Sequence, residues 1–340
     1  MLRLKRATVV VAGGLRADAM EQRLSVQIGA ERRAAIADVG LVGAAQPGDE
    51  VIVNVEAAEL NLGSGGFDIV HVNLTRGLDG QGTPRAHVMK LNYTSLQHAV
   101  SPVEEGDADA TTPAPALPIG IPAAVLALHG QLAPLAWAFR QAGGGRLGYV
   151  QTAGGALPGG HSCVVRELRD GGLLVEHLTA GSAFGGADGE AITTAAALHH
   201  GLTQLGWDAA VAGPGPGILG SGSALGHGGL QALDCAHTAL ALGCPTLLVA
   251  RMSSTDLRAR HRGISHHTRT VLELLLAPVA VALPAGERPP KDRHDWRSAP
   301  TDLHAYAASG LPTRSMGRED PLFFAAALAA GNVLAQLRCR

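Results

Sequence analysis

Length, composition and charge describe a globular chain with a large core. The 340 residues are 46% hydrophobic and 16% charged, which allows two domains and argues against large-scale disorder. The net charge of −2 gives no electrostatic reason to expect nucleic acid or a membrane surface as a partner. Aromatic residues make up only 3% while glycine occurs 45 times, which favours an α/β fold whose helices lie close to a sheet.

The beginning of the chain predicts a small β-barrel-like domain over residues 1–100. Short strands are expected at 7–11, 23–28, 33–36, 50–55, 67–72 and 86–91. Turn sequences such as Gln46-Pro47-Gly48-Asp49 separate them. Residues 101–120 then predict a linker, because Glu104, Glu105, Asp107 and Asp109 precede a proline-rich segment.

The N-terminal segment resembles a signal peptide only superficially. Basic residues precede the apolar run 7–15, and Ala17-Asp18-Ala19 imitates a cleavage site. The run contains two glycines and continues into a strand pattern, so we reject that interpretation. No apolar segment approaches the roughly 20 residues of a transmembrane helix. The four cysteines are widely spaced, which favours reduced thiols in a cytoplasmic protein.

Residues 121–340 predict an α/β domain with three layers. Apolar strands are expected at 124–128, 147–151, 173–177, 209–212, 246–250 and 279–283. Amphipathic helices are expected between them at 132–142, 161–169, 190–205, 229–242 and 266–276. This alternation is typical of βαβ units and a mostly parallel sheet. A helical tail over 321–337 is expected to cover one sheet edge or to pack on a neighbouring subunit, which leaves a homo-oligomer open.

Polar and glycine-rich segments follow the predicted strands, whereas the connections that lead back into strands are plainer. Ligands of parallel sheets bind outside the carboxyl ends of the strands, where helix N-termini also point. We therefore expect an anionic small molecule at this edge. The expected ligand-binding residues are Thr152, Gly154, Gly155, His161, Gly185, Gly213, Gly215, Gly217, Gly220, Ser221, Ser223, His227, Arg251, Arg262, Ser265 and His267.

The stretch 209–230 is the most glycine-rich of these segments. Gly215, Gly217 and Gly220 formally match a dinucleotide fingerprint after a strand. The match is weak, because the following helix is deferred to about Gly229 and two prolines remove amides that a phosphate would need. Arg251 after the next strand would suit an NADP-type 2′-phosphate. A different phosphate or carboxylate cradle, and a packing loop without a ligand, are the alternatives.

The segment 258–268 combines three arginines with His261, His266 and His267. One interpretation is an anion clamp with a histidine acid/base, because arginine forks match phosphate or carboxylate. A metal site is the second, although His266 and His267 diverge by about 100° on a helix, so His261 with one of them is the easier pair. A solvated basic face is the third. We assign no metal ligands, and the cofactor is left unknown.

Three further residues complete the expected site. Ser265 can cap the helix that begins at His266. Asp256 is well placed for acid/base work, and Ser162 opens a helix just after two glycines. A serine nucleophile needs a neighbouring base and a strained turn, and this sequence lacks the second glycine of that turn. The candidate catalytic residues are His261, His266, Ser162 and Asp256.

Several segments resemble an uncharacterised bacterial family, a domain-of-unknown-function family of actinobacteria and related lineages. They span nearly the whole chain and comprise 48–54, 63–66, 87–91, 148–158, 183–186, 213–226 and 261–268. Ala153 stands where we expect the family to carry an acidic residue. The resemblance implies the same domain plan and no particular activity.

These observations together predict an enzyme of transferase or hydrolase type. The glycine loop and Arg262 would hold the anion, His261 or His266 would move a proton, and Ser162 or Thr152 would orient the substrate. A ligand-sensing or scaffold protein is the alternative from another class, and a dinucleotide-binding protein is a further one.

Overall fold

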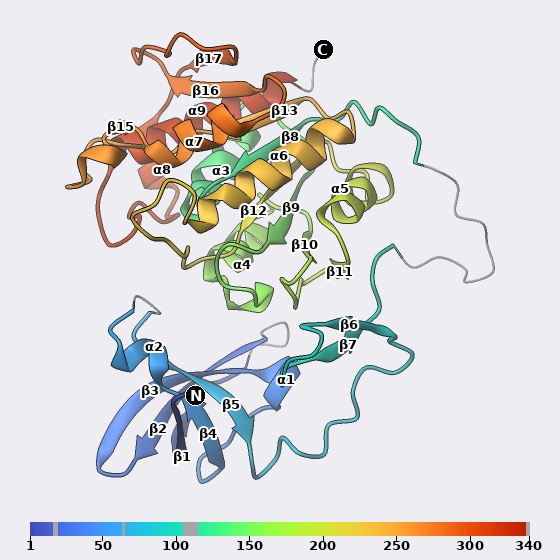
Figure 1. Cartoon of the computed structure of the whole chain (residues 1–340), viewed down its shortest axis with the longest axis vertical. Helices are drawn as coiled ribbons and strands as arrows, with labels where there is room; N and C mark the ends of the chain where they lie inside the picture. The colour runs from blue at the N-terminus through green and yellow to red at the C-terminus, as the bar shows by residue number, and fades with distance from the viewer. Residues whose placement is uncertain (16–19, 63–64, 105–114, 338–340) are drawn as a thin grey trace. The chain divides into compact units, whose positions relative to one another are not determined.

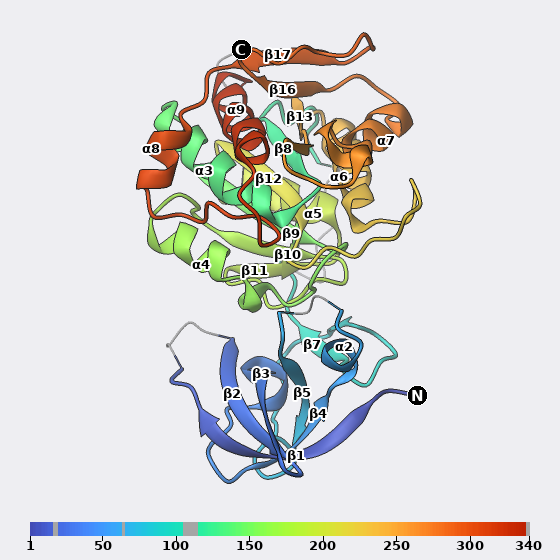
Figure 2. The same cartoon turned by 90° about the vertical axis from the view of Figure 1, so that its left-hand side faces the viewer.

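The computed structural model describes residues 1–15, 20–62, 65–104 and 115–337. The chain divides into two compact units, Met1–Ser101 and Pro102–Arg340, which are drawn from two sides in Figures 1 and 2. Several residues discussed above, namely Ala17 to Ala19, Gly63, Glu105, Asp107, Asp109 and Cys339, lie outside the described residues.

The first unit contains a closed five-stranded barrel with the strand order β1-β2-β3-β5-β4. Its strands are β1 (Leu4–Ala12), β2 (Glu21–Ile28), β3 (Glu31–Asp38), β4 (Glu50–Asn54) and β5 (Asp68–Asn73), with short helices α1 (Val39–Val42) and α2 (Glu56–Glu59). Val51 and Val53 of β4 point into the core and are fully buried, as the alternation of a half-buried strand requires. The expected β-barrel is confirmed.

The sixth strand expected in this unit does not join the barrel. Residues 88–90 form β6 (Val88–Lys90), which pairs with β7 (His98–Val100) in a separate two-stranded sheet. The strand is short because Leu91 and Tyr93 have φ angles of +48° and +60°, a left-handed conformation that ends an extended segment.

A buried carboxylate stabilises one end of the barrel, and its removal should weaken this unit. Burial raises the pKa of Asp49, but hydrogen bonds from Asn73, the Gln46 amide and Arg76 outweigh it and lower the pKa overall. Asp49→Ala should therefore cost about 2 kcal/mol at pH 7. A lowered native pKa stabilises above the unfolded-state value of about 3.9, so this difference should shrink as the pH falls below about 4.

Urea unfolding at pH 7 and at pH 3, followed by circular dichroism, measures this difference. Asp79 is exposed, and Asp79→Ala is the control, expected to change stability by less than about 0.5 kcal/mol. Equal stability of Asp49→Ala and wild type at pH 7 would contradict the assignment.

The second unit is built on an eight-stranded sheet with the order β11-β10-β9-β12-β8-β13-β16-β17. All its neighbouring pairs are parallel, so the predicted α/β class is confirmed. The strands are β8 (Ala123–Leu126), β9 (Leu147–Thr152), β10 (His177–Ala180), β11 (Gly189–Ala191), β12 (Ala209–Pro214), β13 (Thr246–Val249), β16 (Ala280–Pro284) and β17 (Asp295–Ala299). A separate pair consists of β14 (Met252–Ser253) and β15 (Gly263–Ile264).

The helices of this unit cover both faces of the sheet. They are α3 (Leu132–Gln141), α4 (Cys163–Asp170), α5 (Thr194–Thr203), α6 (Gln231–Ala241), α7 (His266–Leu274), α8 (Leu303–Ala308) and α9 (Pro321–Leu337). Short 3-10 turns are η1 (His129–Gln131), η2 (Gly159–His161), η3 (Gly228–Leu230) and η4 (Ala259–His261). None of the helices in the described ranges is both long and apolar enough to span a lipid bilayer.

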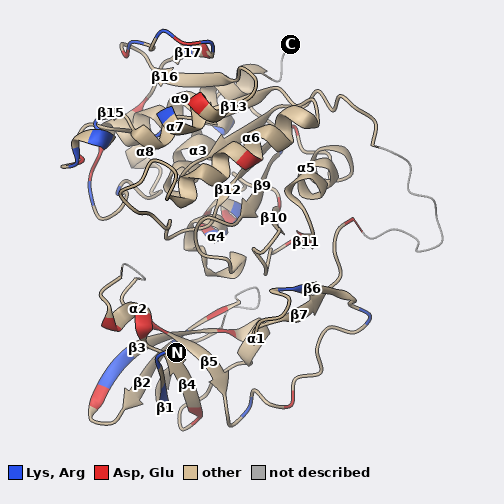
Figure 3. Ribbon diagram, viewed as in Figure 1, with Lys and Arg blue, Asp and Glu red and all other residues tan. Residues whose placement is uncertain are grey.

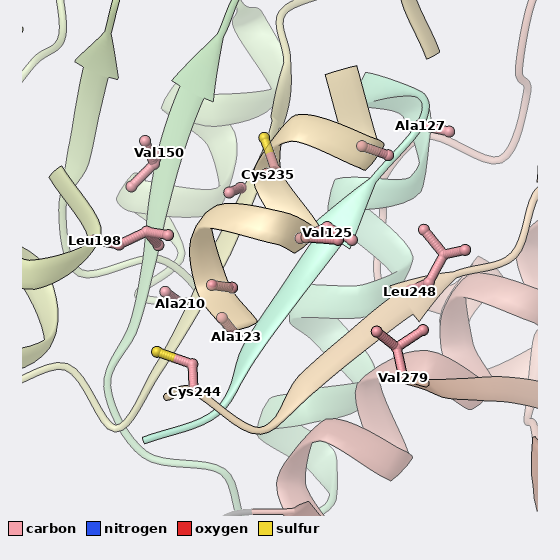
Figure 4. Packing of buried hydrophobic residues seen from close by; sticks show 14 of the residues in the cluster. Ala123, Val125, Ala127, Val150, Leu198, Ala210, Cys235, Cys244, Leu248 and Val279 are labelled. Carbon is pink, nitrogen blue, oxygen red and sulfur yellow. The ribbon is translucent and has the colours of Figure 1, made fainter. Parts of the chain in front are cut away.

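Two hydrophobic clusters lie on opposite faces of the sheet. One packs α5, α6 and α7 on the sheet and contains buried Cys235 and Cys244; part of it is drawn in Figure 4. The other packs α3, α4 and α9 on the opposite face. Small side chains such as Ala123 and Ala210 keep α6 close to the sheet, as the low aromatic content indicates. Helix α9 lies on the same face as α3, beside that helix and against β16 and the edge strand β17.

The predicted elements of this unit need three corrections. The expected strand 173–177 begins later, at His177, because the amides of Leu173 and Leu174 bond back to Leu168 at the end of α4. The expected helix 190–205 begins at Thr194, because Glu190 belongs to β11. Strands β11 and β17 were not expected: the first has only three residues, and the second is a polar edge strand without an apolar run.

Candidate functional site

The parallel sheet brings the carboxyl ends of all its strands to one edge. The connections after β8 and β9 lead toward β10, whereas those after β12 and β13 lead toward β16. Connections that diverge in this way open a crevice outside the strand ends, where ligands of doubly wound sheets bind. The sequence-predicted residues follow β9, β10, β12 and β13 and so lie along this edge.

Four histidines gather at this edge, on the α7 side of the sheet. His227 comes from the loop after β12, His261 from η4, and His266 and His267 begin α7. The rings of His227 and His267 are stacked with centroids 3.6 Å apart, and the His266 centroid lies 4.4 Å from that of His267. The His261 ring is 4.7 Å from that of His266. We refer to these four residues as the histidine cluster.

Local hydrogen bonds explain why α7 begins at this place. Ser265 Oγ accepts from the His267 amide at 3.3 Å and lies 2.8 Å from His261 Nδ1, so the expected cap also positions one ring of the cluster. Thr268 Oγ1 accepts from the Arg251 amide at 2.8 Å, which ties the first turn of α7 to the end of β13. The adjacent pair His266 and His267 can then face one site, although regular helix geometry makes such neighbours diverge.

Burial and nearby arginines keep the cluster uncharged at neutral pH. Burial, aided by Arg251, lowers the pKa of His261 to about 4 and also lowers that of His267. Burial also lowers the pKa of His227 and that of His266. In His227, the nearby Ala224 carbonyl partly opposes the lowering of the pKa. Neutral imidazoles offer a lone pair on one ring nitrogen, so these rings can bind a proton donor or a metal ion.

The arginines around the cluster are of two kinds. Arg251 is 3% exposed and donates to His267 Nδ1 at 2.8 Å. Burial lowers the pKa of Arg251 to about 10, although Asp256 raises it. Arg260 and Arg262 are exposed, and neither has a carboxylate partner within the described ranges; Arg262 Nε donates to the Asp256 carbonyl at 3.1 Å. Figure 3 shows this basic segment beside β15.

The Asp256 carboxylate is held in place by arginine side chains. Its carboxylate is buried and accepts from Arg258 at 2.8 and 3.0 Å and from Arg318 at 3.1 Å, with Arg251 3.6 Å away. The hydrogen bond from Arg258 is the main reason why its pKa lies well below the usual range. A carboxylate held in this way stays ionised, so the contacts favour an ion-pair hub over the proton-transfer role expected from the sequence.

The glycine loop after β12 packs by its backbone. A Cβ added at Gly155 would lie 2.2 Å from the Gly215 carbonyl oxygen, and one at Gly228 would lie 1.9 Å from that of Gly154. The Ala156 amide donates to the Pro216 carbonyl at 2.6 Å. These glycines are therefore required by contact between the loops after β9 and β12, which is the packing alternative considered above. The first helical turn after β12 begins only at Gly228, so the fingerprint glycines do not lie at a helix N-terminus.

The remaining predicted residues of these loops have mixed roles. The expected ligand residues Gly213, Gly217 and Gly220 lie in β12 or the following loop, and Gly220 forms a bridge with His227. Ser221 and Ser223 are exposed and bond within the loop. Thr152 is buried and donates to the Ala153 carbonyl at 3.3 Å. The Gly185 amide donates to Glu190 at 3.1 Å, and His161 is half-buried in η2.

Ser162 does have the neighbouring base that the sequence could not identify. Its Oγ lies 2.7 Å from His129 Nε2, and His129 Nδ1 lies 3.3 Å from the Tyr149 hydroxyl. Tyr149 donates to the Pro214 carbonyl at 2.9 Å, so its oxygen accepts from Nδ1 and leaves Nε2 to accept from Ser162. Ser162 also caps α4 through the Val165 amide and is only 3% exposed. In this arrangement the pair joins η1 to α4 and is closed to a substrate.

Comparison with known proteins shows to which family the chain belongs. A family model described as a protein of unknown function (DUF3866) matches residues 34–331. The chain belongs to this family. The match runs from β3 of the barrel to α9, so the family resemblance inferred from the sequence is confirmed. No curated protein and no solved structure matches the chain.

The sequence places His129 just after the first predicted strand of the α/β domain, but we did not choose it as a site residue. Tyr149 was missed, and His227 was not connected with the histidines of α7. His129 lies three residues after the end of β8, a position that marks it as an edge residue. Nothing local marks Tyr149, which lies inside a buried strand. Two cavities stand apart from the edge residues: one of 550 Å³ between α7 and the segment 290–296, and one of 390 Å³ beside Glu59 and Asp68 of the barrel unit.

Proposed function

We propose that this protein is an enzyme, of transferase or hydrolase type, that binds an anionic small molecule at the carboxyl edge of its parallel sheet. One observation carries the proposal. The exposed guanidinium groups of Arg260 and Arg262 have no carboxylate partner among the described residues, and they lie next to the histidine cluster, of which His227, His261 and His267 are buried. Arginine forks of this kind match phosphate and carboxylate groups.

The roles differ from those expected from the sequence alone. Arg260 and Arg262 would hold the anion, and His266, which is half-buried, would be the histidine nearest to solvent. His261 would move a proton through Nε2, because its Nδ1 already pairs with Ser265. Thr152, Ser162 and Asp256 would have structural roles, since the side-chain oxygens of all three are already hydrogen-bonded within the protein. The glycine loop would form one wall of the site. Because its backbone packs closely against the loop after β9, dinucleotide binding there is disfavoured.

Binding is tested by thermal unfolding of the full chain with a panel of phosphorylated and carboxylated metabolites, in the presence of a chelator. A ligand at 100 times its Kd stabilises by about 2.7 kcal/mol, which corresponds to a rise of several degrees in Tm. The double variant Arg260→Met/Arg262→Met should lose this rise. Arg288 is exposed outside the site, and Arg288→Met is the matched control.

Two results would contradict the proposal: no compound of the panel raises the Tm of wild type, or the double variant responds as wild type does. A ligand-sensing protein is the second candidate, favoured because the Asp256 carboxylate is held by Arg258 and Arg318 and is not available to pair with a histidine in proton transfer. A compound that binds to wild type and to His261→Ala equally, and that neither protein converts, would select the sensor.

A further inference from the structure

We propose that His227, His266 and His267 form a site for a divalent transition-metal ion of the Zn²⁺ type. Each of these histidines offers one ring nitrogen, and the three nitrogens lie within 4.8 Å of one another. His227 approaches from the loop after β12, and the other two from the first turn of α7. The site therefore joins two segments that are far apart in the sequence.

Unsatisfied ring nitrogens at the centre of the cluster point to a missing ligand. His227 is 6% exposed, and neither of its ring nitrogens makes a hydrogen bond of normal geometry within the described residues. The buried Nε2 of His266 likewise lacks a hydrogen bond there. Buried polar atoms are bonded in nearly all cases, because an unpaired one costs free energy. A metal ion takes one lone pair from each neutral imidazole, so an ion at this place accounts for one nitrogen of His227 and for Nε2 of His266.

The donor set selects the class of ion. Three imidazoles without a carboxylate suit zinc, copper, nickel or iron, and they do not suit the oxygen-seeking Mg²⁺ or Ca²⁺. Zn–N bonds of about 2.0–2.1 Å place tetrahedral ligand nitrogens about 3.3 Å apart. The observed limit of 4.8 Å is wider, so side-chain rotations of the histidines would close the site. Three protein ligands leave a fourth position for water, as in catalytic zinc sites.

Arg251 regulates access to His267 in this proposal. Its guanidinium donates to His267 Nδ1 at 2.8 Å and lies 3.6 Å from the Asp256 carboxylate. A guanidinium only donates, so its bond occupies a lone pair that a metal would need. When the ion binds to His267, Arg251 would lose this acceptor, turn to Asp256 and complete that ion pair. Removal of the Arg251 guanidinium should therefore strengthen metal binding.

This inference goes beyond the proposed function, because it needs no anionic substrate. The experiment is a calorimetric titration of the metal-stripped full chain with Zn²⁺ in a non-coordinating buffer, together with visible absorption after Co²⁺ addition. Wild type should bind one ion, and Co²⁺ should show the ligand-field bands of a tetrahedral nitrogen site. His227→Ala and His266→Ala should each weaken Zn²⁺ binding by more than about 100-fold. Loss of a residue that only hydrogen-bonds to a metal ligand already lowers the affinity by about 10- to 100-fold.

Two further variants complete the design. Arg251→Met should bind Zn²⁺ about 10-fold more tightly, because a hydrogen bond to a charged group no longer competes. His304 is exposed on α8, and His304→Ala should bind as wild type does. Circular dichroism of the metal-free proteins reports folding, and the half-buried His266 gives the deciding variant if His227→Ala does not fold. Absence of stoichiometric binding to wild type, or equal affinities for wild type and His266→Ala, would overturn the proposal.

Discussion

Asp256→Ala should destabilise the α/β unit by about 3 kcal/mol, because removal of one partner leaves a buried charge without compensation. The Asp256 side chain is 1% exposed, and Arg251, 3.6 Å away, is 3% exposed. Arg258 and Arg318 are 47% and 33% exposed, so both can return to water at little cost. The buried guanidinium of Arg251 therefore accounts for most of the expected loss.

Urea unfolding followed by circular dichroism measures this loss. The control is Asp295→Ala: Asp295 is 56% exposed in its ion pair with Arg297, and its removal should cost less than about 0.5 kcal/mol. Retention of wild-type stability by Asp256→Ala, together with loss of substrate turnover, would instead support the acid/base role expected from the sequence.

Gly148→Ala should cost at least about 3 kcal/mol, at the upper end of the range for overpacked cores. A Cβ at Gly148 would lie 2.1 Å from the Trp207 ring, and one at Gly201 would lie 2.3 Å from the same ring. Trp207 is 1% exposed, and its Nε1 donates to Glu176 at 2.6 Å. The indole is thus held between β9 and α5 and cannot move away from an added methyl group.

A double variant separates this clash from other effects of the substitution. Gly148→Ala/Trp207→Leu should be more stable than the sum of the two single changes predicts, because the smaller side chain relieves the contact. A Cβ at Gly222 would meet no atom within 4 Å, so Gly222→Ala is the control and should stay within about 0.5 kcal/mol of wild type. Additive single changes, measured by urea unfolding, would contradict the proposed clash.

The success of the sequence predictions depended on how local each signal is. Alternating side chains in β4 and the apolar runs of β8, β12 and β13 identified the strands, because burial of one or both faces leaves a pattern within a few residues. Strand β17 has no such pattern, since its edge position leaves Asp295 and Trp296 partly exposed. The apolar residues 173–175 were misleading for a related reason, because Leu174 is buried against the core while its backbone closes the end of α4.

The candidate site was likewise predictable only where its signal is local. The segment 258–268 and the glycine stretch were visible as chemically dense parts of the chain, yet their partners were not. The pairing of His129 with Ser162 requires β8 and β9 to direct their loops to the α4 face. The meeting of His227 with His267 requires the loop after β12 to reach α7, on the other face.

The sequence by itself determined the fold class, the barrel and the concentration of polar residues after the strands, because each of these leaves a periodic or compositional signal. Only the tertiary structure decided which of those residues meet. Strand β8 lies between β12 and β13 in the sheet, and this order depends on packing between distant segments, which no local pattern encodes. The histidine cluster and its arginines are a consequence of that order.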